Sequence, residues 1–321
     1  MIEVTNLTKH YGPKHAVDNI SFTINSGEIV GFLGPNGAGK STTMNIMTGY
    51  LSATEGTVKI DGIDILDDPL VAKRHIGYLP EHPPLYLDMT VDEYLSFVYD
   101  LKGVKGVSKA KHIAEVCESV SISHVRKRVI GNLSKGYKQR VGLAMAMIGN
   151  PDVLILDEPT VGLDPNQIIE IRNVIKDLGK ERTVILSSHI LPEVQAICER
   201  VLVINNGKIV ANDTPENLSK AVAEDHKLIV RVSGKKEEIA SVLRGCDGIR
   251  TAEYLGVHEE GSCDFVIESD PNVDLRKPMF YALAKAGSPI LMLKPMDMTL
   301  EDIFLKLTTD ESADTSAKED K

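Results

Sequence analysis

The sequence predicts an α/β fold, in which buried strands alternate with helices, followed by a small α+β domain. Short apolar runs such as Glu28–Leu33 and Val153–Leu156 have the length of strands that are buried on both faces. A chain of 321 residues, of which 42% are hydrophobic, has room for one large domain and a small one. We expect domains at 1–220 and 221–308, and a disordered polar tail at 309–321.

The glycine-rich stretch Gly34–Thr42 (GPNGAGKST) lies between the run Glu28–Leu33 and a predicted helix, Thr43–Tyr50. Glycines let a backbone curl until several N–H groups point at one anion, and a helix N-terminus adds a positive dipole end. Lys40 is expected to reach the β- and γ-phosphates of a nucleotide, and Ser41 to offer its hydroxyl to Mg²⁺. A mere glycine turn is the alternative, but the flanking strand and helix disfavour it. The candidate ATP contacts in this loop are Gly34, Pro35, Asn36, Gly37, Ala38, Gly39, Lys40, Ser41 and Thr42.

The residues before this loop predict two half-buried strands, Met1–Thr5 and Ala16–Asn25, because apolar and polar residues alternate in both. Tyr11 precedes a glycine between them. An aromatic ring there could stack on a base, although taken alone it is more often a packing or turn residue.

The residues after the loop predict a hairpin and then a helical insert. The dipeptide Asp61-Gly62 between two short apolar runs indicates a two-residue hairpin turn. The strand Ile76–Leu79 runs into a proline-rich loop, which can be neither helix nor central strand. Helical spacing follows in Thr90–Asp100 and Ala110–Val120, with Thr90 and Ser108 as candidate N-caps, so we expect a helical subdomain at about 82–150.

Two adjacent carboxylates, Asp157 and Glu158, come directly after the apolar strand Val153–Leu156. The crevice beyond the carboxyl ends of parallel strands is where α/β sheets bind ligands. Asp157 is therefore predicted to hold Mg²⁺, and Glu158 to orient or deprotonate an attacking water molecule. His189 follows the next predicted strand, Thr183–Leu186, and becomes a catalytic candidate for the same reason.

The composition excludes several classes of function. The net charge is −10, with 46 acidic and 36 basic residues, which disfavours nucleic acid as a partner. The four cysteines are widely spaced and read as reduced thiols rather than as a disulfide or zinc framework. No apolar run approaches the length that spans a bilayer, so we expect a soluble, cytoplasmic protein whose membrane role depends on a partner.

From Met1 to about residue 220 the chain resembles the ATP-binding subunits of ABC transporters, because seven stretches match that family in order. Tyr11 sits at the position of the adenine-stacking aromatic, and Gly34–Thr42 matches the Walker A loop. Glu81 falls at the Q-loop, Leu133–Tyr137 (LSKGY) at the signature sequence, and Val153–Glu158 at Walker B. The last two matches are the D-loop with Asp164 and the switch residue His189.

The resemblance implies a P-loop ABC ATPase core, with an antiparallel β subdomain and a helical insert, that hydrolyses Mg-ATP. Two ATPase subunits, either two copies of this chain or this chain and a different ATPase subunit, would face each other head to tail. Ser134 and Gly136 of one subunit would then contact the γ-phosphate held by the other. Hydrolysis would drive a polytopic membrane permease, which would place the chain peripherally on the inner face of the membrane. The expected permease interface is Pro83, Pro84, Leu85 and Tyr86.

Two departures from the family pattern bear on the chemistry. Glu81 stands where glutamine is usual; a carboxylate can still ligate Mg²⁺, which makes Glu81 a further candidate ligand, but it adds negative charge beside phosphates. Lys135 and Tyr137 replace the usual glycine and glutamine of the signature, whereas Gly136 is kept. Because Glu158 and His189 are both present, we expect an active ATPase.

The stretch Gly77–Tyr86 (GYLPEHPPLY), together with LSKGY and the closing Thr299–Leu307, is similar to the ATPases of ABC-2-type exporters, including those of gliding motility and of drug, antibiotic or polysaccharide export. Beyond this core, the pattern from Lys227 to Leu293 predicts the order βαββαβ, which is ferredoxin-like. No function can be inherited from such a fold.

Two other functions stay open at this point. A soluble ABC ATPase that acts on ribosomes or DNA usually has two cassettes or a long coiled-coil insert, and this chain has neither. A regulatory ATP sensor that binds without turnover is supported only by Glu81 and Lys135. Steady-state ATP hydrolysis distinguishes the sensor from the transporter subunit.

Overall fold

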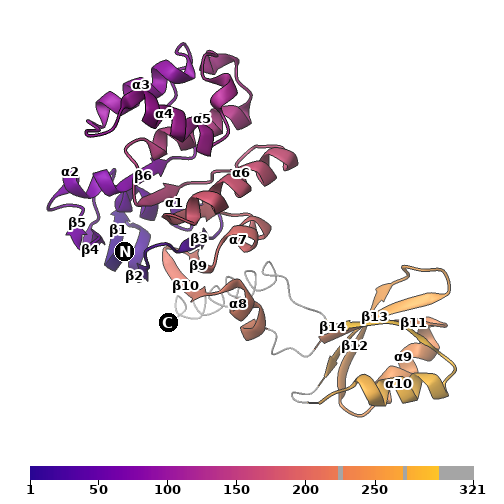
Figure 1. Ribbon diagram of the computed structural model, residues 1–321. Helices are drawn as coiled ribbons and strands as arrows, with labels where there is room; N and C mark the ends of the chain where they lie inside the picture. The colour runs from indigo at the N-terminus through magenta and orange to yellow at the C-terminus, as the bar shows by residue number, and fades with distance from the viewer. Residues whose placement is uncertain (223–226, 270–272, 296–321) are drawn as a thin grey trace. The chain divides into compact units, whose positions relative to one another are not determined.

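A computed structural model describes residues 1–222, 227–269 and 273–295 (Figure 1). The chain divides into two compact units, one from Met1 to Pro215 and a second beginning at Glu216, so the division comes a few residues before the one expected at 220. The expected disordered tail and the exporter-like stretch 299–307 lie outside the described residues.

A six-stranded sheet forms the centre of the first unit. Its strand order is β10-β9-β3-β8-β7-β6, and all neighbours pair in parallel except β10 and β9. The strands are β3 (Ile29–Leu33), β6 (Ile76–Leu79), β7 (Val153–Leu156), β8 (Thr183–Ser188), β9 (Arg200–Asn205) and β10 (Lys208–Asp213). Because β3, β7 and β8 run in the same direction, the residues that follow them meet at one edge of the sheet.

An antiparallel sheet packs against this centre. Its order is β2-β1-β4-β5, with β1 (Ile2–Tyr11), β2 (Lys14–Ile24), β4 (Glu55–Ile60) and β5 (Ile63–Asp64). Both residues of the predicted Asp61-Gly62 turn have positive φ, as a tight two-residue hairpin requires. The two sheets share one core, in which the Phe22 and Phe32 rings meet edge to face at 5.3 Å.

Three helices form the expected insert and lie together at the top of Figure 1: α3 (Val91–Leu101), α4 (Lys109–Ser119) and α5 (Lys135–Met147). Thr90 caps α3 through a capping box with Glu93. Ser108 does stand at the N-cap of α4, but its side chain accepts no capping hydrogen bond, so only half of that prediction is correct. At the C-terminal end of α5, Lys102 donates to the carbonyls of Met145, Ala146 and Ile148.

Shorter elements and flanking helices complete the first unit. The helix α1 (Lys40–Met47) follows β3, α6 (Pro165–Gly179) follows β7, and α7 (Leu191–Ile197) follows β8. The connecting segments contain α2 (Pro69–Ala72) and three single-turn 3₁₀ helices, η1 (Lys73–His75), η2 (Ser123–Val125) and η3 (Ile130–Asn132). Among the described helices, none is long and apolar enough to cross a membrane.

The second unit has the predicted order of strands and helices. Helix α8 (Pro215–Val222) leads into β11 (Lys227–Ser233), α9 (Lys236–Arg244), β12 (Ile249–Gly256), β13 (Ser262–Ser269), α10 (Arg276–Lys285) and β14 (Ile290–Pro295). The sheet order is β12-β13-β11-β14, and every pairing is antiparallel. Apolar side chains of both helices and of the sheet form its own core, with Phe265 and Met279 fully buried. The ferredoxin-like assignment stays a prediction.

Candidate functional site

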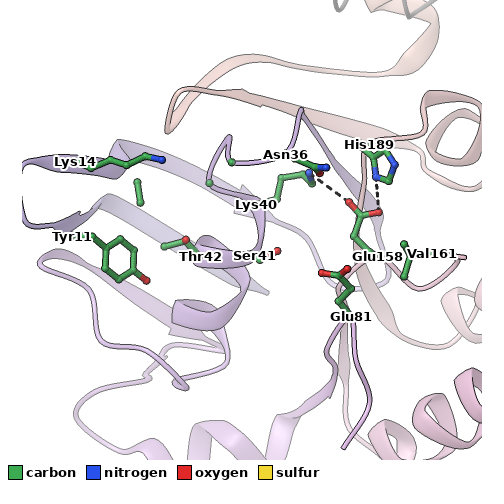
Figure 2. Close-up of a pocket in the computed structure, with 13 residues that line it drawn as sticks. Tyr11, Lys14, Asn36, Lys40, Ser41, Thr42, Glu81, Glu158, Val161 and His189 are labelled. Carbon is green, nitrogen blue, oxygen red and sulfur yellow. Dashed lines mark hydrogen bonds and ion pairs between the residues drawn. The ribbon is translucent and has the colours of Figure 1, made fainter.

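A cavity of about 320 Å³ opens where β3, β7 and β8 end (Figure 2). The residues that line it come from the β1–β2 hairpin, the glycine-rich loop with the start of α1, and the segments that follow β6, β7 and β8. They are Tyr11, Lys14, Ala16, Asn36, Gly37, Gly39, Lys40, Ser41, Thr42, Glu81, Glu158, Val161 and His189. Residues predicted from five separate stretches of sequence therefore line one cavity.

The glycine-rich loop can adopt its curled path only with glycine at several positions. Gly37 and Gly39 have φ of 83° and 111°, in the left-handed region that disfavours side chains. A Cβ atom at Gly34 would lie 2.3 Å from the Ile204 carbonyl oxygen. No side chain caps the start of α1, whose residues Lys40, Ser41 and Thr42 line the cavity, so its first N–H groups are left as donors suited to an anion.

Lys40 begins α1 and is buried beneath the loop. Its ammonium donates to the carbonyls of Gly34 at 2.8 Å and Pro35 at 3.3 Å. It also pairs with Glu158, with 3.5 Å between Nζ and Oε1. The loop carbonyls and Glu158 therefore hold this positive charge at the floor of the cavity.

Asp157 is buried behind the cavity wall and accepts hydrogen bonds from two hydroxyls. Its Oδ1 lies 3.2 Å from Ser41 Oγ and 2.5 Å from Ser187 Oγ. A carboxylate and a hydroxyl are oxygen ligands of the kind Mg²⁺ takes, so the donor set fits that ion. Burial and the negative charge of Asp157 together raise the pKa of the Tyr78 phenol. Ser41 and Asp157, each predicted as a Mg²⁺ ligand from distant stretches, are thus in direct contact.

Glu158 has an unusual backbone and links Lys40 to His189 (Figure 2). Its φ of 48° is left-handed, which strains a residue with a side chain and persists only when the surroundings hold it. Its N–H donates to Ser187 Oγ at 2.9 Å, and its Oε2 lies 2.9 Å from His189 Nδ1. A carboxylate held this way at the cavity surface suits the orientation of a nucleophilic water.

Tyr11 lies in the cavity wall with half of its surface exposed, as a ring available for stacking must be. Three lining residues, Lys14, Ala16 and Val161, were not predicted from the sequence. Lys14 was detectable, since it is a basic residue three positions after the candidate aromatic. Ala16 and Val161 are small apolar residues whose sequence context gives no such indication.

The predicted signature and D-loop residues lie outside this cavity. Ser134 caps α5 by accepting from the Tyr137 N–H, and Asp164 caps α6 by accepting from the Gln167 N–H. A Cβ atom at Gly136 would meet Gln167 Oε1 at 2.6 Å. The N-termini of α5 and α6 are therefore neighbours, and neither Ser134 nor Gly136 is among the residues that line the cavity. The ammonium of Lys135 lies against Gly162 in the D-loop segment.

A second, mostly apolar groove of about 430 Å³ lies beside α3. Pro84 and Tyr86 line it, and the Tyr86 ring meets Phe97 at 5.5 Å and Tyr94 at 6.1 Å. Two other members of the predicted interface, Pro83 and Leu85, do not line it; Pro83 packs on α5 close to Gly142. Lys102 also lines the groove, and burial of its ammonium lowers its pKa to about 8.

Comparison with known proteins gives consistent matches. A family model described as ABC transporter matches residues 17–161. The chain is 40% identical to the uncharacterized ABC transporter ATP-binding protein YxlF of Bacillus subtilis, covering 96% of this chain and 99% of that protein. It is 34% identical to the bacitracin transport ATP-binding protein BcrA of Bacillus licheniformis, and the match covers 96% of this chain and 97% of that protein. Its fold matches a dimeric post-hydrolysis structure of the ATP-binding cassette MJ0796 bound to ADP and Pi, with a TM-score of 0.60 and 26% sequence identity. The match covers 67% of this chain and 98% of that one.

Proposed function

The chain belongs to the ATP-binding proteins of ABC transporters, and we propose that it powers an ABC-2-type exporter through a membrane permease. It is an ATPase with the cassette fold. The observation that carries the proposed site is the joining of Lys40, Glu158 and His189 at one cavity, with Ser41 and Asp157 in contact behind it. The relative that is named for bacitracin transport supports an export role.

We assign the following roles to the residues of this site. The N–H groups of the loop and the Lys40 ammonium bind the phosphates of ATP, while Tyr11 stacks on the base. Ser41 and Asp157 hold Mg²⁺, with Glu81 as a further candidate, and the ion neutralises phosphate charge. Glu158 orients the attacking water, and His189 fixes the direction of the Glu158 carboxylate.

ATP binding has a built-in consequence for Glu158. In the site without nucleotide, the Lys40 ammonium donates to two carbonyls and pairs with Glu158. Phosphate oxygens carry more charge than a carbonyl, so bound ATP draws the ammonium toward itself and leaves Glu158 free to hold water. The Lys40–Glu158 ion pair therefore occupies the Glu158 carboxylate in the empty site, and its release on ATP binding makes Glu158 available to the attacking water.

The signature residues act on a second copy in this proposal. Ser134 and Gly136 stand at the N-terminus of α5, outside the chain's own cavity. Facing another cassette, that helix start provides donors for the γ-phosphate held there. Contacts that form only in the closed pair are differential contacts, and such contacts can move a conformational equilibrium.

The apolar groove beside α3 is the proposed seat of the permease, with Pro84 and Tyr86 as its contact residues. Tyr86→Ala is expected to leave ATP hydrolysis by the isolated chain within about twofold of wild type, because Tyr86 lies outside the catalytic cavity. In proteoliposomes with the permease, transport per ATP hydrolysed should fall by about tenfold, since a buried aromatic anchor is worth about 1–3 kcal/mol.

The matched control for that variant is Tyr281→Ala, which removes the same side chain from an exposed position on α10. It should leave coupling intact. Unchanged transport per ATP hydrolysed in Tyr86→Ala would mean that the permease binds to a surface other than this groove.

The exporter assignment is tested by purifying the tagged chain from gently solubilised membranes of its native cell. A polytopic membrane protein in near-equal amount is expected. Recovery without a membrane protein, alone or with ribosomes, would refute the assignment and favour an ABC ATPase of the ribosome- or DNA-associated kind. Absence of steady-state ATP hydrolysis in the isolated chain and in the complex would instead favour the ATP sensor.

A further inference from the structure

A buried carboxylate, Glu193, is not among the residues that line the catalytic cavity. Glu193 lies in the first turn of α7 and is only 4% exposed. Its Oε2 accepts two hydrogen bonds, from Thr160 Oγ1 at 2.5 Å and from Ser188 Oγ at 3.2 Å. Its Oε1 is buried and has no hydrogen-bond partner among the residues that the structure describes.

The two hydroxyls on Glu193 come from the segments that carry the two catalytic candidates. Thr160 follows Glu158 by two residues, in a turn where the Val161 N–H donates to the Glu158 carbonyl at 3.1 Å. Ser188 directly precedes His189, and its Oγ accepts from the Ile190 N–H at 2.9 Å. Glu193 Oε2 therefore connects the turn after β7 to the last residue of β8.

Stability alone does not explain this carboxylate. Burying a charged group costs free energy unless it is paired, and across the described ranges no Lys, Arg or His forms an ion pair with Glu193. The unpartnered Oε1 adds to that cost. Glu158, meanwhile, holds a strained left-handed backbone that its surroundings must impose. The two hydroxyls on Glu193 belong to Thr160, two residues after Glu158, and to Ser188, the residue before His189.

We propose that Glu193 is a positioning residue for ATP hydrolysis, which holds the Glu158 and His189 segments in register through Thr160 and Ser188. This inference rests on the catalytic roles proposed above for Glu158 and His189. Glu193 does not line the cavity, so it acts through those two residues and not on the nucleotide.

The first test measures ATP hydrolysis by the full chain with Glu193→Ala and Glu193→Gln. The alanine variant is expected to lower kcat by about 10- to 100-fold, the range typical when a supporting hydrogen bond to a catalytic group is lost, with KM for ATP within about threefold. Glutamine keeps an oxygen acceptor for both hydroxyls and should restore most of kcat. Glu181→Ala, which removes an exposed glutamate, is the matched control and should resemble wild type.

A double-mutant cycle tests the route of the effect. Thr160→Val and Ser188→Ala each remove one hydroxyl that Glu193 accepts from, and each should lower kcat. Added to Glu193→Ala, neither should lower kcat much further, because the shared contact is already gone. If the alanine variant does not fold, Glu193→Gln, Thr160→Val and Ser188→Ala decide the question.

The results that overturn the inference are distinct from those that overturn the proposed function. A kcat within twofold of wild type in Glu193→Ala, or full additivity with both hydroxyl variants, refutes the positioning role. A raised KM with unchanged kcat refutes it as well. If Glu158→Gln keeps wild-type turnover, the catalytic assignment itself fails; if Glu158→Gln is inactive and the Glu193 variants are normal, only the present inference fails.

Discussion

Glu158→Gln is expected to reduce steady-state ATP hydrolysis by about 100-fold or more, the scale for loss of a positioned general base. Glutamine has nearly the same shape and can still contact His189, but it cannot take a proton from water. The substitution also removes the carboxylate that pairs with Lys40 at 3.5 Å. Because the ammonium is then freer to reach phosphate, ATP affinity should be equal to wild type or higher. Phosphate release and calorimetric ATP binding measure the two effects separately.

The control for that variant is Glu81→Gln, an identical change at another carboxylate in the same cavity. Glu81 is exposed, and glutamine keeps an oxygen that can still bind Mg²⁺, so turnover should persist. Removing its charge beside the phosphates should tighten ATP binding by about two- to fivefold, the scale of a solvent-screened charge interaction. Turnover that survives in Glu158→Gln but is lost in Glu81→Gln would transfer the role of base to Glu81.

The parts of the catalytic cavity whose backbone path depends on nearby residues in the sequence could be predicted. The turn of Gly34–Thr42 depends on glycines at fixed positions, and these are visible in sequence. Asp157 and Ser41, each predicted separately as a Mg²⁺ ligand, share a hydrogen bond, as the rule that parallel strands end at one edge of a sheet would allow. Sequence alone could not place β3 between β8 and β9, because strand pairing is decided by contacts between distant residues.

The residues that were missed share a physical cause. Ala16 and Val161 line the cavity, but their small apolar side chains carry no chemistry that marks them in the sequence. Glu193 is one of 46 acidic residues, and only its burial against Thr160 and Ser188 distinguishes it. The start of α1 was placed at Thr43 but lies at Lys40, since hydroxyl residues that usually cap helices stand inside this one.

Lys40→Ala is expected to weaken ATP binding by about 100-fold or more, because it removes the ammonium that would reach the phosphates and that no other described residue of the cavity can replace. Lys14 is the other lysine of the lining, but Figure 2 shows it on the Tyr11 side, away from Glu158. Calorimetric titration with Mg-ATP gives the dissociation constant. Lys40→Arg keeps the charge but has a larger, planar head, so it should recover only part of the affinity.

The same substitution should also destabilise the empty protein, because Lys40 compensates a buried carboxylate. Both partners of the Lys40–Glu158 pair are at least nine-tenths buried, and removing one partner of such a pair costs about 3 kcal/mol. Adding Glu158→Gln to Lys40→Ala removes the unpaired charge, so denaturant unfolding should show most of that stability regained. ATP binding should stay lost in the double variant, because the phosphates still lack their ammonium. Recovery of binding together with stability would mean that Lys40 serves the fold of the empty site and not the nucleotide.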